Sequence, residues 1–223
     1  MGRCVYGVRR KIKQATPDKT RAAPGTSRYW QNRYASGGDS GLGSRGSQRL
    51  FKLEVINKLI NDYGIHSIAD LGCGDGQQLV GMAPCRYYGC DVSECAINIC
   101  LELFKKDASK LFSVGIVPSC APVDMAMSLD VVYHLVSTRS YRRHLDDLVA
   151  LSTRFVLIYS SNIKNAHTSG HVRHRLFVRD IQRNYAQHLR LKETMFPPPE
   201  LNTVACFYLY ERLNVKGGDL CIK

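Results

Sequence analysis

One short segment, residues 70–76 with the sequence Asp-Leu-Gly-Cys-Gly-Asp-Gly, constrains the fold of this chain more than any other feature. It overlaps the end of the apolar run Ile65–Leu71, which is predicted to be a strand, and precedes Gln77–Met82, which is predicted to open a helix. Three glycines at alternate positions let the backbone turn tightly and approach a ligand, and the following helix presents unpaired amide groups to it. The dinucleotide-binding fingerprint needs a glycine at position 77, where this chain has Gln77, so a nicotinamide- or flavin-dependent dehydrogenase is disfavoured.

Strand and helix patterns alternate along the rest of the chain. The predicted strands are Ile65–Leu71, Tyr87–Val92, a weakly marked segment at Phe112–Val114, Met125–Leu129, Phe155–Tyr159, Leu189–Lys192 and Val204–Tyr210. The predicted helices are Leu50–Ile60, the segment opened at Gln77, a helix capped by Ser93 that runs through Phe104, Tyr141–Leu151 and a helix around Ile181. This alternation predicts an α/β fold with a mostly parallel sheet, covered by helices on both faces and closed by an antiparallel edge.

The length of 223 residues fits one domain with an extension better than two domains. Residues 1–28 show neither a helical nor a strand period and are predicted to form a basic flexible arm. Residues 29–223 are predicted to form one domain, with an N-terminal cover and helix at 29–62 and a core at 63–223. The glycine-rich stretch 37–46 lies between aromatic residues and an amphipathic helix, so it is predicted to cover a site rather than to separate domains.

Positive charge is concentrated near the N-terminus. Of a net charge of +12, residues 1–50 carry 11 Lys and Arg against two Asp, a net of +9, and the remaining residues carry +3. Clusters of Lys and Arg bind polyanions because they release the counterions of the phosphate groups. A polyanion-binding arm is one interpretation of this pattern, and a solvated disordered tail is the alternative.

Several classes of protein are excluded by the remaining features. No charge-free stretch is long enough to span a bilayer, so no membrane protein is predicted. No apolar stretch follows the basic residues 9–11, so no secretory signal is predicted; the cytoplasm is the expected location, with the nucleus and a mitochondrial transit peptide as alternatives. The nine cysteines include no Cys-x-x-Cys pair, so mostly buried thiols and no metal site are expected.

A second carboxylate ends the strand that follows the glycine bend. Asp91 lies where a carboxylate can accept hydrogen bonds from both hydroxyls of a bound ribose. The alternative is an aspartate that only helps to cap the helix after Ser93. Because the glycine bend precedes it, the ribose-binding interpretation is favoured.

These segments resemble the class I S-adenosylmethionine-dependent methyltransferases. Residues 68–76 (Ile-Ala-Asp-Leu-Gly-Cys-Gly-Asp-Gly) are similar to that family's first motif and residues 89–93 (Gly-Cys-Asp-Val-Ser) to its ribose-binding second motif. Residues 128–135 (Ser-Leu-Asp-Val-Val-Tyr-His-Leu) are similar to the stretch after its fourth strand. The resemblance implies a Rossmann-like, seven-stranded, mostly parallel sheet with an antiparallel edge strand, and S-adenosyl-L-methionine as the cofactor.

The resemblance also implies which residues hold the cofactor. Asp70 and the glycines would hold its methionine end, and Asp91 its ribose. Leu129 and Asp130 would form the rim that faces the acceptor. Residues 29–46 resemble a segment of some small methyltransferases and would fold over the cofactor; the alternative is a surface loop ordered only by packing of Trp30. The implied cofactor-binding residues are Tyr34, Asp70, Gly72, Cys73, Gly74, Asp75, Gly76, Asp91, Val92 and Leu129.

Asp130 and His134 are the candidate catalytic residues. They are four positions apart just beyond a predicted strand, so a helical turn there would place them on one face, where either could remove or orient a proton. For His134, a structural hydrogen bond is the alternative. Asp130 also belongs to a set, with Lys52, Lys164 and Glu193, that stands in the order of the Lys-Asp-Lys-Glu tetrad of ribose 2′-O-methyltransferases, an order that a lysine-rich chain easily produces by chance.

A basic segment after the fifth predicted strand is the candidate acceptor site. Its expected substrate-binding residues are His171, Arg173, His174 and Arg175. Arginine and histidine side chains between a strand end and a helix suit an anionic acceptor such as a phosphate or a carboxylate. A solvated helix start is the alternative.

The sequence therefore predicts a methyltransferase with RNA as the favoured acceptor, and an mRNA cap methylated at guanine N7 is one concrete version. One alternative is a small-molecule, glycan or protein methyltransferase, in which the basic arm serves only localisation. Another is a non-catalytic module that binds the cofactor or RNA on the same fold. Neither a metal nor a membrane is expected among the partners.

Overall fold

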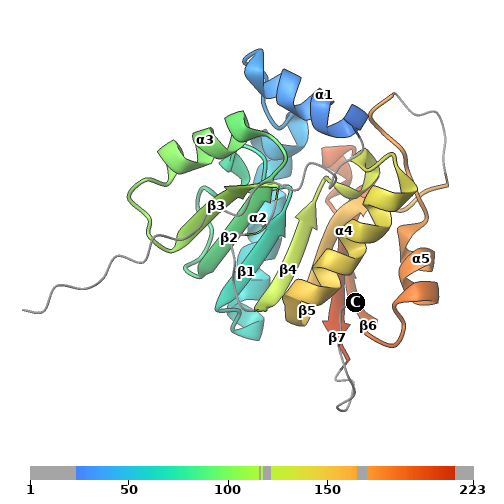
Figure 1. Cartoon of the computed structure of the whole chain (residues 1–223). Helices are drawn as coiled ribbons and strands as arrows, with labels where there is room; N and C mark the ends of the chain where they lie inside the picture. The colour runs from blue at the N-terminus through green and yellow to red at the C-terminus, as the bar shows by residue number, and fades with distance from the viewer. Residues whose placement is uncertain (1–23, 116, 118–121, 165–169, 214–223) are drawn as a thin grey trace, which may run out of the picture.

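A computed structural model describes residues 24–115, 117, 122–164 and 170–213 (Figure 1). The predicted basic arm comprises residues 1–28, of which residues 1–23 lie outside the described residues. From Pro24 onward the chain is helical, so helix α1 (Pro24–Ala35) begins inside the segment that was predicted to be arm. The boundary predicted at residue 28 is therefore too late.

The sheet has seven strands in the order β3-β2-β1-β4-β5-β7-β6. The strands are β1 (Ser67–Leu71), β2 (Arg86–Asp91), β3 (Lys110–Val114), β4 (Val123–Leu129), β5 (Ser152–Ser161), β6 (Leu189–Met195) and β7 (Ala205–Arg212). Neighbouring strands are parallel from β3 to β5, and β7 is antiparallel to both β5 and β6. This topology confirms the predicted α/β class, including the antiparallel pairing at one end of the sheet.

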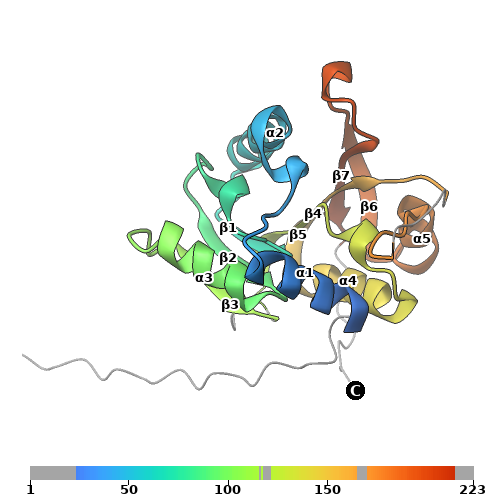
Figure 2. The same ribbon diagram turned by 90° about the horizontal axis from the view of Figure 1, so that it is seen from above.

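Helices cover both faces of the sheet. Beside α1 they are α2 (Gly46–Tyr63), α3 (Glu94–Leu103), α4 (Thr138–Leu151) and α5 (Phe177–Asn184), with short 3-10 helices η1 (Leu42–Ser44), η2 (Gln77–Leu79), η3 (Val132–His134) and η4 (Pro199–Leu201). In Figure 1, α4 crosses in front of the sheet and α2 lies behind it, and Figure 2 shows the two on opposite sides from above. Helix α1 lies across the carboxyl ends of the parallel strands in both views.

Two clusters of buried apolar side chains form because successive strand residues point to opposite faces. In β4, Met125 and Met127 belong to the cluster that includes residues of α2 and α3, whereas Ala126 belongs to the cluster that includes residues of α4 and α5. Helices α2, α3, α4 and α5 therefore each bury an apolar stripe against one face of the sheet, as the sequence pattern predicts.

Local signals explain where the helices end. Helix α2 ends at Gly64, whose φ of 56° is left-handed and costs a glycine little. The predicted cap of α3 is confirmed, because the Ser93 hydroxyl accepts a hydrogen bond from the amide of Ala96. By contrast, the helix predicted to open at Gln77 is a single 3-10 turn, because Gly81 has a φ of 90° and the chain must already extend to enter β2.

The described residues contain no helix that is both long and apolar enough to cross a membrane. Within the same residues, no group of three or more His, Cys, Asp or Glu side chains is arranged to hold a metal ion. Nor does a disulfide join any of the cysteines that the structure places, and Cys73, Cys85 and Cys100 are buried.

Candidate functional site

A cavity of about 330 Å³ lies at the carboxyl ends of β1, β2 and β4, and Thr26, Trp30 and Tyr34 of α1 line it. The structure brings most of the predicted site together here. The predicted residues that line the cavity are Tyr34, Asp70, Gly72, Cys73, Gly74, Asp91, Val92, Leu129, Asp130 and His134. Its size falls within the range of small-ligand sites.

The glycine bend between β1 and η2 forms one wall of the cavity. Gly72 and Gly74 have φ values of 94° and 58°, which L side chains rarely adopt. A Cβ atom on Gly72 would lie 2.4 Å from Cγ2 of Val131, and one on Gly74 would lie 2.5 Å from Oγ of Ser40. These glycines are therefore required for the close approach of other parts of the protein.

The amide groups of the bend are used within the protein. The amides of Gly72 and Cys73 donate to the carbonyl oxygen of Cys90, and the amide of Gly74 donates to the Asp91 carboxylate. The sequence pattern predicts that amides at a helix N-terminus are free to meet a ligand. With only one 3-10 turn after the bend, the carboxylates rather than free amides are the polar groups that face the cavity.

Asp91 is held in a fixed orientation at the end of β2. Its Oδ2 accepts a hydrogen bond from the Gly74 amide at 3.1 Å, and its Oδ1 accepts one from the Ser93 amide at 2.9 Å. Burial raises the pKa of Asp91 to about 6, although both amide hydrogen bonds act in the opposite direction. Each oxygen keeps a further lone pair for a ligand hydroxyl.

Asp70 is more deeply buried, with 2% of its surface exposed. Its Oδ2 accepts a hydrogen bond from the Tyr87 hydroxyl at 2.6 Å, whereas its buried Oδ1 has no partner among the described residues. Burial raises the pKa of Asp70 to about 7, against the lowering effect of the Tyr87 hydrogen bond. A buried carboxylate oxygen without a partner is costly, so a ligand donor at this point would stabilise it.

The stretch between α1 and α2, residues 36–45, is tied to the glycine bend by Asp75. Its Oδ2 lies 2.7 Å from a guanidinium nitrogen of Arg45, and its amide donates to Oγ of Ser40, which is also hydrogen-bonded to the hydroxyl of Tyr34. Asp75 and Gly76, both predicted to touch the cofactor, do not line the cavity. Asp75 instead holds the cover, which we define as residues 24–45, over the cavity.

Lys52, which the order of the tetrad groups with Asp130, also lines the cavity. It is 1% exposed on α2, and its Nζ lies 2.6 Å from Oδ2 of Asp130. Asp130 has a φ of 61°, which is unusual for a residue other than glycine, and its Oδ1 accepts a hydrogen bond from the Tyr133 hydroxyl at 2.8 Å. Of the tetrad, Lys164 lines a second groove instead and Glu193 is exposed on β6, so only two of its four members meet.

His134 ends the 3-10 helix η3 and lines the cavity. Its Nδ1 lies 3.0 Å from the carbonyl oxygen of His171, and its ring meets the Trp30 ring edge-on at a centroid distance of 5.0 Å. Because a carbonyl oxygen only accepts, Nδ1 carries the hydrogen and Nε2 keeps a lone pair. Burial lowers the pKa of His134, which favours this neutral form.

The predicted acceptor-binding residues lie beside this cavity rather than in its lining. His171 stacks on Tyr29 with a centroid distance of 4.0 Å. Arg173 and Arg175 both donate to the carbonyl oxygen of Val136, and His174 is hydrogen-bonded to Ser161. Arg173, His174 and Arg175 line the second groove.

Helix α4 contributes a wall of the cavity that was not predicted from the sequence. His144, Asp147 and Leu151 line it, and Nε2 of His144 lies 2.8 Å from Oγ of Ser128. Burial lowers the pKa of His144 to about 4. The spacing of three and four residues between these side chains is a helical period, and it could have identified them as one face of α4.

Comparison with known proteins adds to this geometry. No family model matches the sequence, and no curated protein matches it either. Solved structures are similar in fold. The N-methyltransferase NodS from Bradyrhizobium japonicum WM9 has a TM-score of 0.66 at 16% identity, covering 84% of this chain and 98% of that one. For the magnesium protoporphyrin IX methyltransferase from Synechocystis PCC 6803 the TM-score is 0.62 at 16% identity, with 84% and 98% covered.

A third similar structure is the [4+2]-cyclase SpnF, with a TM-score of 0.59 at 12% identity, covering 78% of this chain and 76% of that one. Identities this low establish the fold and leave the reaction to be argued from the site. The chain therefore has the fold of the class I S-adenosylmethionine-dependent methyltransferases.

Proposed function

We propose that this protein transfers a methyl group from S-adenosylmethionine to an RNA acceptor. The observation that carries the proposal is that one cavity joins the glycine bend and Asp91 to Asp130 and His134. The first pair suits a nucleoside ligand, and the second pair suits an acceptor that loses a proton. Similar structures were crystallised with S-adenosylmethionine or S-adenosylhomocysteine bound, which supports the choice of cofactor.

The residues of the cavity fit this cofactor. Asp91 has lone pairs for the ribose hydroxyls, and the unpartnered Oδ1 of Asp70 suits a donor such as the ammonium group. The side chains of Tyr34 and Trp30 line the cavity from the cover and shield that side of it from water. S-adenosylmethionine would supply an electrophilic methyl group on a sulfonium centre.

The chain's own contribution is to align the acceptor and to accept a proton. Nε2 of His134 has its lone pair free for a hydroxyl or amine proton. Asp130 is held by Lys52 and Tyr133, so its carboxylate can orient the acceptor without moving. Its left-handed backbone is a local strain of about 1–3 kcal/mol, the kind that clusters at functional sites.

Charge supports RNA as the acceptor class. The net charge of +9 within residues 1–50 suits a polyanion. Removing residues 1–23, which leaves α1 intact, should lower methylation of RNA and weaken its salt dependence. Unchanged methylation of RNA by that truncated chain would leave localisation as the role of the arm.

A direct test is transfer of tritium from labelled S-adenosylmethionine to capped RNA, uncapped RNA, a protein lysate and a metabolite pool. Label in RNA alone is the expected result, whereas label only in protein or metabolites would overturn the RNA acceptor. Guanine N7 of a cap carries no proton, so His134→Gln should leave cap methylation intact and slow transfer to a hydroxyl about 100-fold or more.

A small-molecule acceptor is the second candidate. The size of the cavity, about 330 Å³, favours it, as do the neighbours whose names specify a porphyrin methyltransferase and an N-methyltransferase. Isothermal titration calorimetry with S-adenosylmethionine, combined with the transfer assay, distinguishes the RNA and small-molecule methyltransferases from a non-catalytic module. No binding would reject any enzyme of this type, and binding without transfer to any acceptor would favour the module.

A further inference from the structure

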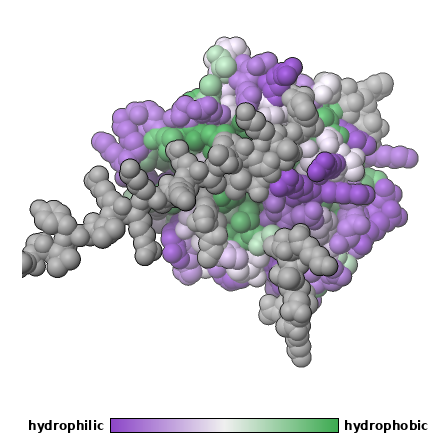
Figure 3. Space-filling model, viewed as in Figure 1, coloured by the Kyte–Doolittle hydropathy of each residue, from purple (hydrophilic) through white to green (hydrophobic). Residues whose placement is uncertain are grey.

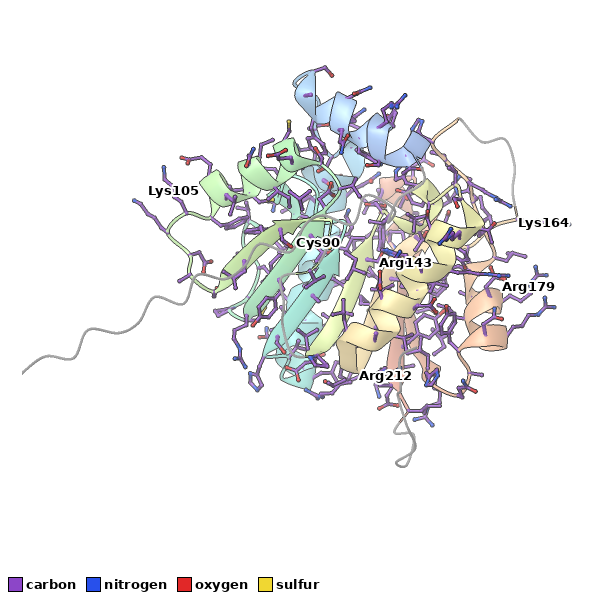
Figure 4. The ribbon with its side chains drawn as sticks, viewed as in Figure 1. Cys90, Lys105, Arg143, Lys164, Arg179 and Arg212 are labelled. Carbon is purple, nitrogen blue, oxygen red and sulfur yellow. The ribbon has the colours of Figure 1, made fainter. Side chains whose placement is uncertain are left out.

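A second groove, of about 630 Å³, lies between α4 and α5. We call it the α4–α5 groove. It is lined by Arg142 of α4, Arg179 of α5, and Lys164, Arg173 and Arg175 of the connection between β5 and α5. Figure 4 shows Lys164 and Arg179 on the outer side of the molecule near α5, and the surface over α4 and α5 is largely hydrophilic in Figure 3.

The groove has an excess of positive charge. Five cationic side chains face two carboxylates, Asp146 and Asp180. The carboxylates are engaged by tyrosines, since Tyr185 donates to Asp146 at 2.6 Å and Tyr141 donates to Asp180 at 3.1 Å. The excess cations therefore suit an external anion.

Three of the five cations are exposed and have no ion pair among the described residues: Arg142, Lys164 and Arg179. Unpaired cations that share one concave surface repel each other and raise the local positive potential. An anion bound between them would remove that repulsion. Its charge must be multiple or repeated, because the excess is three positive charges.

The other two arginines are fixed by the protein. Arg173 and Arg175 each donate to the carbonyl oxygen of Val136, and the Arg175 guanidinium lies 4.5 Å from the ring centroid of Tyr141. Burial lowers the pKa of Arg175, and the neighbouring positive charge of Arg173 lowers it further. Two adjacent guanidinium groups held in place offer a preorganised anion site.

The groove and the candidate active site share a wall. The backbone amide of Arg173 donates to the carbonyl oxygen of Tyr133, and the His174 ring lies 5.8 Å from the Tyr133 ring. Tyr133 itself lines the cavity and binds Asp130. A chain molecule that lies in the groove can therefore place one of its units over the cavity.

We propose that the α4–α5 groove binds consecutive phosphate groups of a single-stranded RNA whose target nucleotide enters the adjoining cavity. The inference rests on the proposed function, because it locates the acceptor of that same reaction. The stacked rings of Tyr29 and His171 beside the cavity offer a platform for a flanking base. The concave shape disfavours a flat bilayer surface, which would not reach the groove's interior.

The test is binding of a fluorescein-labelled single-stranded RNA to the full chain by fluorescence anisotropy, without cofactor, at several salt concentrations. The variant Arg142→Ala/Lys164→Ala/Arg179→Ala should bind at least about tenfold more weakly than the parent and lower the salt slope by about two, because single strands release about 0.7 counterion per contact. The matched control is Arg139→Ala/Arg183→Ala, which removes exposed arginines of α4 and α5 outside the groove and should bind like the parent.

Equal binding by the parent and the triple variant would overturn the proposal. So would losses in proportion to the number of cations removed, three in the triple variant and two in the control, which would show that only total charge matters. A loss confined to a multiply phosphorylated peptide, with RNA binding unchanged, would assign the groove to a protein partner and also overturn it.

Failure of the groove and failure of the reaction are distinguishable. RNA binding through the groove without methyl transfer would reject the proposed function and keep this inference. Methyl transfer to RNA with an unaffected triple variant would do the reverse. Calorimetry with S-adenosylmethionine should give the same affinity for the triple variant and the parent.

Discussion

Nζ of Lys52 lies 2.6 Å from Oδ2 of Asp130, so a lysine of α2 is paired with the residue that follows β4. The lysine is 1% exposed and the Asp130 side chain 21% exposed, so the pair is largely shielded from water. A buried charge is tolerated only when an opposite charge lies beside it, and Lys52 and Asp130 compensate each other's charge. The pair fixes the carboxylate that faces the candidate acceptor position.

The first prediction concerns this pair. Lys52→Met should lower the free energy of unfolding by about 3 kcal/mol, because it leaves Asp130 with an uncompensated charge. Lys52→Met/Asp130→Asn should recover most of that loss, since asparagine is neutral and tolerates a left-handed backbone. Urea unfolding followed by circular dichroism measures both, and neither variant should transfer methyl groups.

The control for this pair is Lys58→Met on the same helix. Lys58 is exposed and pairs with Asp62 one turn away, so its unfolding midpoint should match the parent's. If Lys52→Met is as stable as Lys58→Met, Lys52 is not needed to compensate the charge of Asp130 in the folded protein.

The second prediction concerns the glycine bend. Gly74→Ala should weaken binding of S-adenosylmethionine by about tenfold or more, equal to about 1.4 kcal/mol, because the added Cβ would displace Ser40 and Tyr34. Gly64→Ala is the matched control, since Gly64 has nearly the same φ and open space around its Cα. Both variants should lose about 1–2 kcal/mol of stability, and only Gly74→Ala should lose affinity in calorimetry.

The third prediction concerns the cover. Arg45→Ala removes the ion pair with Asp75 that holds residues 36–45 against the bend. We expect the dissociation rate of S-adenosylmethionine to rise roughly five- to tenfold in stopped-flow measurements, because the cover opens more often. Arg28→Ala, at an exposed position of α1, is the control and should leave the rate unchanged. An unchanged rate in Arg45→Ala would show that the ion pair does not restrain the cover.

The fourth prediction concerns pH. The pKa of Asp91 is raised to about 6, so its carboxylate is ionised above that pH and can accept both ribose hydroxyls. Affinity for S-adenosylmethionine should therefore fall below pH 6, by up to about tenfold per pH unit. Calorimetry between pH 5 and 8 measures this. Asp91→Asn should bind weakly and keep only the dependence that Asp70 contributes, whose pKa is raised to about 7.

Protonation of Asp91 does not unfold the protein, so unfolding does not explain the loss of affinity for S-adenosylmethionine. Its pKa in the folded protein lies above the ordinary value of 3.8, so the folded state takes up the proton first as the pH falls. Protonation of Asp91 between pH 6 and 4 therefore favours folding. Circular dichroism at each pH verifies that the chain stays folded, and a constant affinity across this range would contradict the assigned role of Asp91.

The sheet and most helices could be predicted because their signals are local. The strands around Ala69, Cys90 and Met127 are short apolar runs ended by polar residues or glycine, and Ser93 marks the start of α3 by its own capping hydrogen bond. Local signals did not predict how short the helix that begins at Gln77 is. Its short apolar pattern was compatible with a helix, and the tertiary path into β2 leaves room only for one 3-10 turn.

The residues of the candidate site likewise fall into those that local sequence identified and those whose contacts it did not. Gly72, Gly74 and Asp91 were identified because a strand, a bend and a strand-ending carboxylate are close in sequence. The role of Asp75 differs from the expectation, because it binds Arg45 of the cover. Arg173 lies in the α4–α5 groove rather than in the cavity. A charged side chain near a motif can point to any of several neighbours, and local spacing does not select among them.

The sequence by itself determined the α/β class, the glycine bend and the carboxylate that follows it, since backbone conformation and strand order depend on patterns within a few residues. Only the tertiary structure decided that Lys52 meets Asp130, that the cover closes on Asp75, and that α4 and α5 enclose a basic groove. These contacts join segments far apart in the chain. Their stability depends on burial and on partner charges, which arise only when the helices pack on the sheet.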